Sequence, residues 1–167
     1  MVTTDSAITY AFIDSQNVNL GVHSSGWNLD FKKFYIYLRD RFKISKSFLF
    51  IGYMAGNESL YTNLQQIGYI LIFKPTLTYR DNGKEKIKGN VDAELVLHTM
   101  IHFNEYNHAV IASGDGDFHC LIEYLESKEK LLKVCIPNKH KYSALLKKYR
   151  SKLLFISDLQ GKLGINN

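Results

Sequence analysis

Residues 10–17, Tyr-Ala-Phe-Ile-Asp-Ser-Gln-Asn, form an apolar run that stops abruptly at Asp14. The run predicts a buried strand, and an acid at the end of such a strand needs a polar partner or a ligand. Residues 109–118, Ala-Val-Ile-Ala-Ser-Gly-Asp-Gly-Asp-Phe, repeat this pattern and end on two further acids. In α/β proteins, ligands bind beyond the carboxyl ends of parallel strands, so chemistry is expected where these two segments end.

The rest of the chain alternates short β-rich runs with apolar residues at helical spacing, without an internal repeat or a linker. This order predicts a three-layer α/β/α fold with a mainly parallel sheet of five to six strands. Its 167 residues suit a single domain spanning 1–167, with a core at about 8–157. The expected strands are 10–13, 46–55, 69–73, 109–112, 131–136 and 153–156, and the expected helices are 29–42, 57–68, 90–102, 118–125 and 142–149.

Local signals set some boundaries of these elements. Asn57 and Asn90 are expected to cap helices, and Gly68 to end the first of them. That first helix has an expected apolar face of Leu60, Leu64 and Ile67. Residues 18–27 contain two glycines and are expected to form a loop over the cleft.

Composition narrows the class of protein. Hydrophobic residues make up 46% of the chain and charged residues 22%, which excludes a disordered or fibrous chain. No apolar run approaches the roughly 20 residues of a membrane span, and the N-terminus lacks a signal peptide, so a cytoplasmic protein without a membrane partner is expected. Two cysteines are too few for a disulfide scaffold or a four-thiolate zinc site, and Cys120 and Cys135 are expected to be reduced core thiols.

The net charge of +5 is unevenly distributed. Residues 128–152 contain nine basic residues and one acid, a net of +8. Such a segment either attracts phosphate backbones or forms an ordinary solvated face. A second basic cluster, Arg80, Lys84, Lys86 and Lys88, surrounds Asn82-Gly83 and predicts an exposed loop or hairpin.

Four acids are expected to converge if the first and fourth strands are neighbours, and they are Asp14, Asp92, Asp115 and Asp117. Taken singly, Asp117 could cap a helix, Asp92 could complement a helix dipole and Asp115 could be a turn residue. Four carboxylates in one cleft would repel one another, and a hard divalent cation such as Mg²⁺ or Mn²⁺ resolves this. The chemistry this implies is metal-assisted phosphodiester hydrolysis.

Other motifs fail. His119 stands where a dinucleotide-binding loop needs glycine, and His119 and Cys120 do not fit an EF-hand. His98 and His102 lack the intervening Glu of a zinc protease, so a histidine metal site is disfavoured. No nucleophile elbow or phosphate-binding Gly-Lys-Ser/Thr loop is present.

Three ordered motifs, residues 12–17, 88–92 and 113–118, together resemble the NYN domain family, in its LabA-like bacterial branch, a relative of the PIN nucleases. The resemblance covers about residues 8–157. It implies a PIN-like fold with an acidic metal site and ribonuclease activity. Carried over by position, it makes the four acids, Asp14, Asp92, Asp115 and Asp117, metal-coordinating and catalytic. Asn17, Lys88 and Ser113 then match positions that bind substrate or support the metal shell.

The leading hypothesis is a divalent-metal-dependent endoribonuclease that draws RNA in through its basic segments. The alternative is a catalytically silent RNA-binding or protein-interaction module with the same fold. A small-molecule phosphohydrolase fits less well, because Asp14 lacks a second acid two residues on. Aromatic side chains are available to stack on bases or to fill the core, namely Trp27, Tyr53, Tyr61, Tyr79 and Tyr142. The sequence leaves the oligomeric state open.

Overall fold

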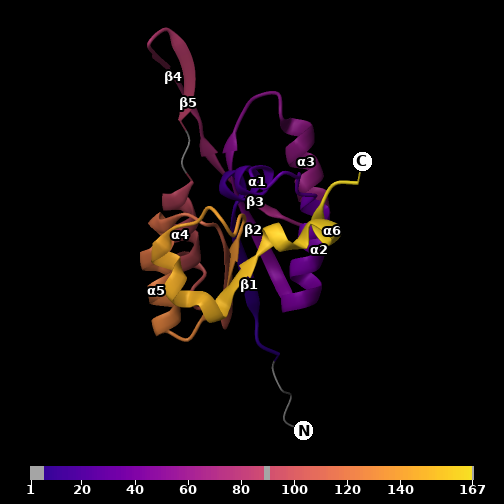
Figure 1. Cartoon of the computed structure of the whole chain (residues 1–167), viewed down its shortest axis with the longest axis vertical. Helices are drawn as coiled ribbons and strands as arrows, with labels where there is room; N and C mark the ends of the chain where they lie inside the picture. The colour runs from indigo at the N-terminus through magenta and orange to yellow at the C-terminus, as the bar shows by residue number, and fades with distance from the viewer. Residues whose placement is uncertain (1–5, 89–90, 167) are drawn as a thin grey trace.

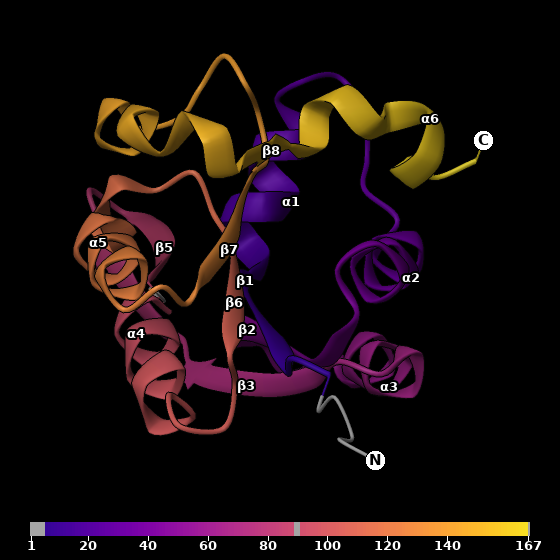
Figure 2. The same cartoon turned by 90° about the horizontal axis from the view of Figure 1, so that it is seen from below.

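The computed structural model describes residues 6–88 and 91–166. A parallel six-stranded sheet runs through the centre, with helices on both faces, as Figures 1 and 2 show. The predicted three-layer α/β/α fold is therefore confirmed. The sheet strands are β1 (Thr9–Asp14), β2 (Ile44–Tyr53), β3 (Ile70–Pro75), β6 (His108–Ala112), β7 (Leu131–Ile136) and β8 (Leu153–Phe155).

The helices divide between the two faces of the sheet. One face is covered by α1 (Ser15–His23), α2 (Phe31–Phe42), α3 (Glu58–Ile67), the 3₁₀ segment η3 (Ile156–Leu159) and α6 (Gln160–Leu163). The other is covered by α4 (Asp92–Ile101), the 3₁₀ turn η1 (Gly116–Phe118), α5 (His119–Ser127) and the 3₁₀ segment η2 (Ala144–Lys152). Figure 2 looks along the sheet edge and separates these two layers.

The strand order is β3-β2-β1-β6-β7-β8, and every neighbouring pair is parallel. Strand β1 alternates between the two cores, because Phe12 packs with α4 and α5 whereas Ile13 packs with α1 and α2. From β1 the chain winds outward to β3, and from β6 it winds outward the other way to β8. The winding direction therefore reverses between β1 and β6, which is where ligands bind in such sheets.

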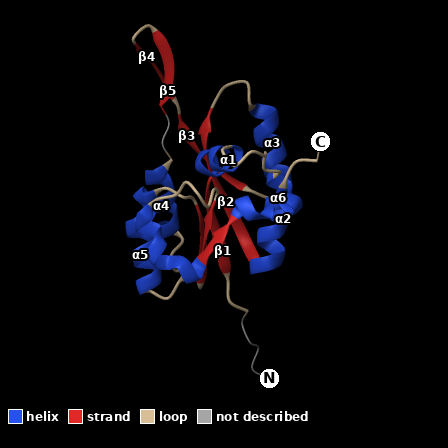
Figure 3. Ribbon diagram, viewed as in Figure 1, coloured by secondary structure: helices blue, strands red, loops and turns tan. Residues whose placement is uncertain are grey.

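The basic cluster around Asn82-Gly83 forms a two-stranded hairpin outside the main sheet, as predicted. Its strands are β4 (Leu77–Asp81) and β5 (Lys84–Lys88). Asn82 and Gly83 both have positive φ, 51° and 75°, as a two-residue hairpin turn of this kind requires. Figure 3 shows the hairpin projecting away from the body, beyond the carboxyl edge of the sheet.

The expected loop at residues 18–27 is wrong over most of its length, because residues 15–23 form helix α1. Asp14 caps this helix, and Val18 and Val22, one turn apart, are fully buried. Gly21 is needed for packing, since a Cβ there would lie 2.5 Å from Cβ of Pro137.

Two other local expectations fail in α3. Asn57 precedes the helix but its side chain makes no capping hydrogen bond. Leu60 is exposed, and Tyr61 with Leu64 supplies the buried face instead. Gly68 ends the helix with a φ of 128°, as expected.

The remaining expectations have mixed outcomes. The predicted cap Asn90 lies outside the described residues, and α4 begins at Asp92. Cys135 is buried, but Cys120 is exposed on α5, so the expectation that both are core thiols is wrong for Cys120. Within the described residues, no helix combines the length and the apolar character that crossing a bilayer demands.

Candidate functional site

The carboxyl ends of β1 and β6 lie side by side at the point where the winding reverses. Ile13 pairs with Ala112, so the next residues, Asp14 and Ser113, emerge at the same edge of the sheet. Asp14 ends β1 and is 5% exposed, and Ser113 is also buried. Helix α4 delivers Asp92 to this edge as its first residue. Segments far apart in the sequence therefore meet here.

Three of the predicted acids form a tight cluster. One carboxylate oxygen from each of Asp92, Asp115 and Asp117 lies within 4.8 Å of the other two. Asp92 and Asp115 are half-buried, whereas Asp117 is exposed. Asp14 stands outside this group of three, but it lines one pocket of about 260 Å³ together with Asp92 and Asp115.

The pKa of Asp14 reflects both its burial and the acidic side chains around it. Burial raises the pKa of Asp14 to about 6, and the negative charges of Asp92 and Asp115 add to the rise. The backbone N–H groups of Asn17 and Gln16 act in the opposite direction but do not offset it. A buried acid whose neighbours are also acids is the environment that a bound cation would relieve.

Hydrogen bonds fix the loop after β1 against the loop after β6. The N–H of Asn17 donates to Oδ1 of Asp14 at 3.2 Å, which caps α1. The side-chain Oδ1 of Asn17 accepts from the N–H of Gly114 at 2.8 Å. Asn17 thus ties the two acid-bearing loops together, and its side-chain NH₂ makes no hydrogen bond to any described residue.

The loop after β6 is also braced from within. Oγ of Ser113 accepts from the N–H of Asp115 at 3.1 Å, and Oδ1 of Asp115 accepts from the N–H of Asp117 at 2.9 Å. The turn alternative therefore describes Asp115 correctly, whereas the capping role expected of Asp117 belongs to Asp115, which caps η1. This capping role does not account for the convergence of Asp115 with Asp92 and Asp117.

The two glycines of this loop are needed because another segment packs closely on them. A Cβ on Gly116 would lie 2.4 Å from Oγ of Ser143, and one on Gly114 would lie 3.2 Å from Cβ of Tyr142. The N–H of Ser143 also donates to the carbonyl of Gly114 at 3.1 Å. The segment before η2 therefore holds the acidic loop from outside, a contact that the sequence does not predict.

Of the positively charged residues near the site, Lys88 ends β5, but its side chain and residues 89–90 lie outside the described residues. The basic segment 128–152 does not form one continuous positive face. Lys139, Lys148 and Lys152 pair with acids, and Lys130 donates to two backbone carbonyls. Lys141 is exposed and directly precedes Tyr142, which packs on the acidic loop.

The aromatic candidates separate into two groups. Tyr53 and Tyr79 are exposed, whereas Trp27 and Tyr61 are buried and Tyr142 is partly buried in the core around α5. Among the described residues, the group of three or more possible metal ligands consists of the aspartates and does not include His98 or His102.

The donor set fits a hard divalent cation. Carboxylate oxygens are the ligands that Mg²⁺ and Mn²⁺ prefer, and three of them are already close enough to share one ion. Three acids held this close repel one another unless a positive charge lies between them.

A family model for the NYN domain matches residues 9–157. The chain belongs to the NYN domain family. This family is part of the PIN-like nuclease superfamily, whose members generally use divalent metals, and the acidic cluster of this NYN domain agrees with that. The family therefore suggests a nuclease that binds nucleic acid.

This NYN domain is similar to one characterised sequence relative and to one solved structure. The low amplitude and bright protein LabA of Synechococcus elongatus is 27% identical over 125 residues, covering 71% of this chain and 67% of LabA, which supports the LabA-like branch. The crystal structure of a protein of unknown function from Vibrio parahaemolyticus matches with a TM-score of 0.77 at 20% identity. That match covers 98% of this chain and 99% of the other, and it shows the fold alone.

Proposed function

We propose that this protein is a divalent-metal-dependent endoribonuclease. The observation that carries the proposal is the convergence of Asp92, Asp115 and Asp117, with Asp14 in the same pocket, at the winding reversal of a nuclease-family fold. In the proposed enzyme these four acids are the catalytic, metal-coordinating residues. Mg²⁺ or Mn²⁺ is the cofactor that suits them.

When bound, the ion would supply Lewis acidity toward a phosphate oxygen and an activated water. The chain's own residues do the positioning. Asn17 holds the acidic loop through Gly114, and its side-chain NH₂, which has no hydrogen-bond partner in the part of the chain that the structure describes, is available to donate to a phosphate oxygen. Ser113 is buried and its hydroxyl accepts from Asp115, which favours support of the acidic loop over direct contact with substrate.

RNA would approach from the carboxyl edge of the sheet. The hairpin β4–β5 projects beyond this edge (Figure 1). It carries Arg80, Lys84, Lys86, which pairs with Asp81, and the exposed Tyr79. Lys88, which we assign to phosphate binding, ends this hairpin four residues before Asp92. Cationic side chains beside an exposed aromatic ring are typical of surfaces that bind single-stranded nucleic acid.

The proposal is tested by incubating end-labelled single-stranded RNA with purified protein and Mn²⁺ or Mg²⁺, with single-stranded DNA in parallel. We expect internal cleavage of RNA that EDTA stops and that Asp115→Asn abolishes. Equal cleavage by the wild type and Asp115→Asn would show that a contaminant is responsible. Binding of RNA that survives both EDTA and the substitution, without cleavage over hours, would instead favour the silent RNA-binding module.

A further inference from the structure

A second cavity adjoins the acidic pocket. It has a volume of about 330 Å³, and it shares Gln16 and Val91 with the acidic pocket. Its walls come from the β1–α1 junction, the end of β2, the start of α3 and Thr76 at the base of the hairpin. Cavities that hold small organic groups begin at about 300 Å³, so this one is large enough for a single ring system.

Part of the polar lining of this cavity is accessible to a bound group. Ser15 is 7% exposed, and its hydroxyl makes no hydrogen bond to any described residue. The Ser15 hydroxyl is not among the fully buried, unpaired polar atoms of the described residues, so it stays accessible from the cavity and can donate to a group bound there. Gln16 and Asn57 also line this cavity, and both are exposed, so their carboxamides, which make no hydrogen bond within the described part of the chain, are accessible to a bound group.

The remaining lining includes apolar side chains, and hydrogen bonds from Tyr61 fix the backbone at the rim. The half-buried side chain of Ile51 and the exposed, flexible thioether of Met54 contribute apolar surface. The Tyr61 hydroxyl accepts from the N–H of Met54 at 2.9 Å and donates to the carbonyl of Gly52 at 3.3 Å, which fixes this rim. A cavity that pairs apolar surface with two carboxamides matches a nucleobase, whose faces are apolar and whose edges carry adjacent donors and acceptors.

We infer that this cavity holds the nucleobase next to the scissile phosphate of an RNA strand, with Gln16 and Asn57 hydrogen-bonding to the base edge. The inference rests on the proposed function for the position of the phosphate. Because the two cavities share Gln16, a phosphate in the acidic pocket places its neighbouring base at the mouth of the second cavity. Both carboxamides present a donor beside an acceptor, so they can pair with the edge of any of the four bases.

The test measures binding without cleavage, using Asp115→Asn protein with Mg²⁺ and a fluorescein-labelled 12-nucleotide RNA. Each of Gln16→Ala and Asn57→Ala, added to this background, is expected to weaken binding by about 3- to 10-fold, the equivalent of one hydrogen bond. Matched controls are Asn19→Ala on α1 and Asn63→Ala on α3, both exposed and outside the cavity. They are expected to bind as the background protein does.

A 12-nucleotide strand without bases separates base contacts from backbone contacts. The cavity variants should bind it no more weakly than the background protein does. Losses that match the controls, or equal losses on RNA with and without bases, would overturn the inference. The affinities come from a protein that does not cleave, so the absence of cleavage by the wild type would defeat the nuclease proposal without deciding this one.

A second readout does not depend on affinity. In ¹⁵N-labelled Asp115→Asn protein, the side-chain amide signals of Gln16 and Asn57 should shift on addition of the base-bearing RNA, whereas those of Asn19 and Asn63 should not. Unchanged signals at Gln16 and Asn57 with saturating RNA would also overturn the inference.

Discussion

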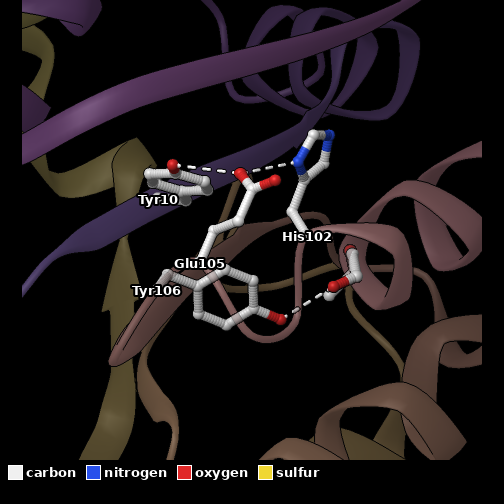
Figure 4. Close-up of polar contacts among 5 residues, drawn as sticks. Tyr10, His102, Glu105 and Tyr106 are labelled. Atoms are coloured by element: carbon white, nitrogen blue, oxygen red, sulfur yellow. Dashed lines mark hydrogen bonds and ion pairs between the residues drawn. The ribbon is translucent and has the colours of Figure 1, made fainter.

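The two ends of helix α4 place acids in opposite environments. Past its C-terminal end, Glu105 accepts from the Tyr10 hydroxyl at 3.2 Å and hydrogen-bonds Nδ1 of His102 at 2.9 Å, as Figure 4 shows. The hydrogen bond to His102 lowers the pKa of Glu105. The Tyr106 hydroxyl beside it donates to the Thr99 carbonyl at 2.9 Å. This amino edge of the sheet is a network in which protein groups satisfy one another.

At the start of α4 the acids face other acids. Asp92 lies with Asp115 and Asp117, and the pKa of nearby Asp14 is raised rather than lowered. Among the described residues, no ion pair involves Asp14, Asp115 or Asp117. Paired polar groups stabilise a fold by themselves, whereas mutually repelling ones indicate an external partner. The contrast favours a structural role for the amino edge and the proposed functional role for the carboxyl edge.

The largest expected effect is on the rate of RNA cleavage, and it should distinguish the acid at the start of α4 from the acid beyond its end. Asp92→Asn should lower metal-dependent RNA cleavage by about 1,000-fold, about 4 kcal/mol in activation free energy, because the cation loses a charged ligand. Glu105→Gln should leave the cleavage rate unchanged. Initial rates at saturating Mn²⁺ check both. Equal losses for the two variants would show that the ends of α4 are not functionally distinct.

The second effect concerns stability without metal. The pKa of Asp14 is about 6 in the folded protein and 3.8 by ordinary expectation, so the folded state binds more protons between these values. The free energy of unfolding in EDTA should therefore fall as the pH rises from about 4 to about 6, by at most about 3 kcal/mol. It should change no further from this source above pH 6.

Asp14→Asn isolates this term, because an Asn oxygen can still accept the Asn17 N–H that caps α1. Urea denaturation at pH 4 and pH 7 should show the wild type losing more stability than the variant. Parallel losses in the two proteins would mean that Asp14 is not the buried acid responsible.

Much of the fold follows from the sequence, since each buried strand is an apolar run bounded by Gly, Pro or an acid. Helix α1 does not, because Gly21 weakens the local signal and the stability of the helix comes from burying Val18 and Val22. Leu60 was a reasonable core residue by spacing, but the larger ring of Tyr61, one position on, occupies the buried face. Tertiary packing decided both cases.

The candidate site, too, is predicted by the sequence only in part. All four acids are visible in the sequence as residues at strand ends or at a helix start, and the family resemblance adds the roles expected of them and of Asn17, Lys88 and Ser113. The hydrogen bond from Gly114 to Asn17 joins residues 97 apart, so no local pattern predicts it. Ser15 and Gln16 lie within the first motif, yet only the structure places them beside Asn57 in a cavity.

The third effect belongs to the amino edge. Tyr106 is almost fully buried, and Tyr106→Phe removes the donor to the Thr99 carbonyl while keeping the ring. The variant should lose about 2 kcal/mol of unfolding free energy, because a buried carbonyl is left without that partner. Its thermal stabilisation by Mn²⁺ should equal that of the wild type. A smaller Mn²⁺ shift would mean that the two edges are coupled.

The smallest effect on stability, and the one that tests how the carboxyl edge is held together, is expected for Asn17→Ala. It removes one half-buried hydrogen bond, which is worth about 1 kcal/mol. Because that bond fixes the loop carrying Asp115, the variant should also bind Mn²⁺ several-fold more weakly, measured as a smaller rise in melting temperature at a fixed Mn²⁺ concentration.

The control is Asn19→Ala, which lies on the exposed side of the same helix and should change neither quantity. If Asn17→Ala costs the expected stability but binds Mn²⁺ as the wild type does, the acids hold their positions without the Asn17 link. The bracing from Tyr142 and Ser143 would then be sufficient to place Asp115. If both quantities fall together, the hydrogen bond between the two loops is what converts a local acidic turn into a metal-binding edge.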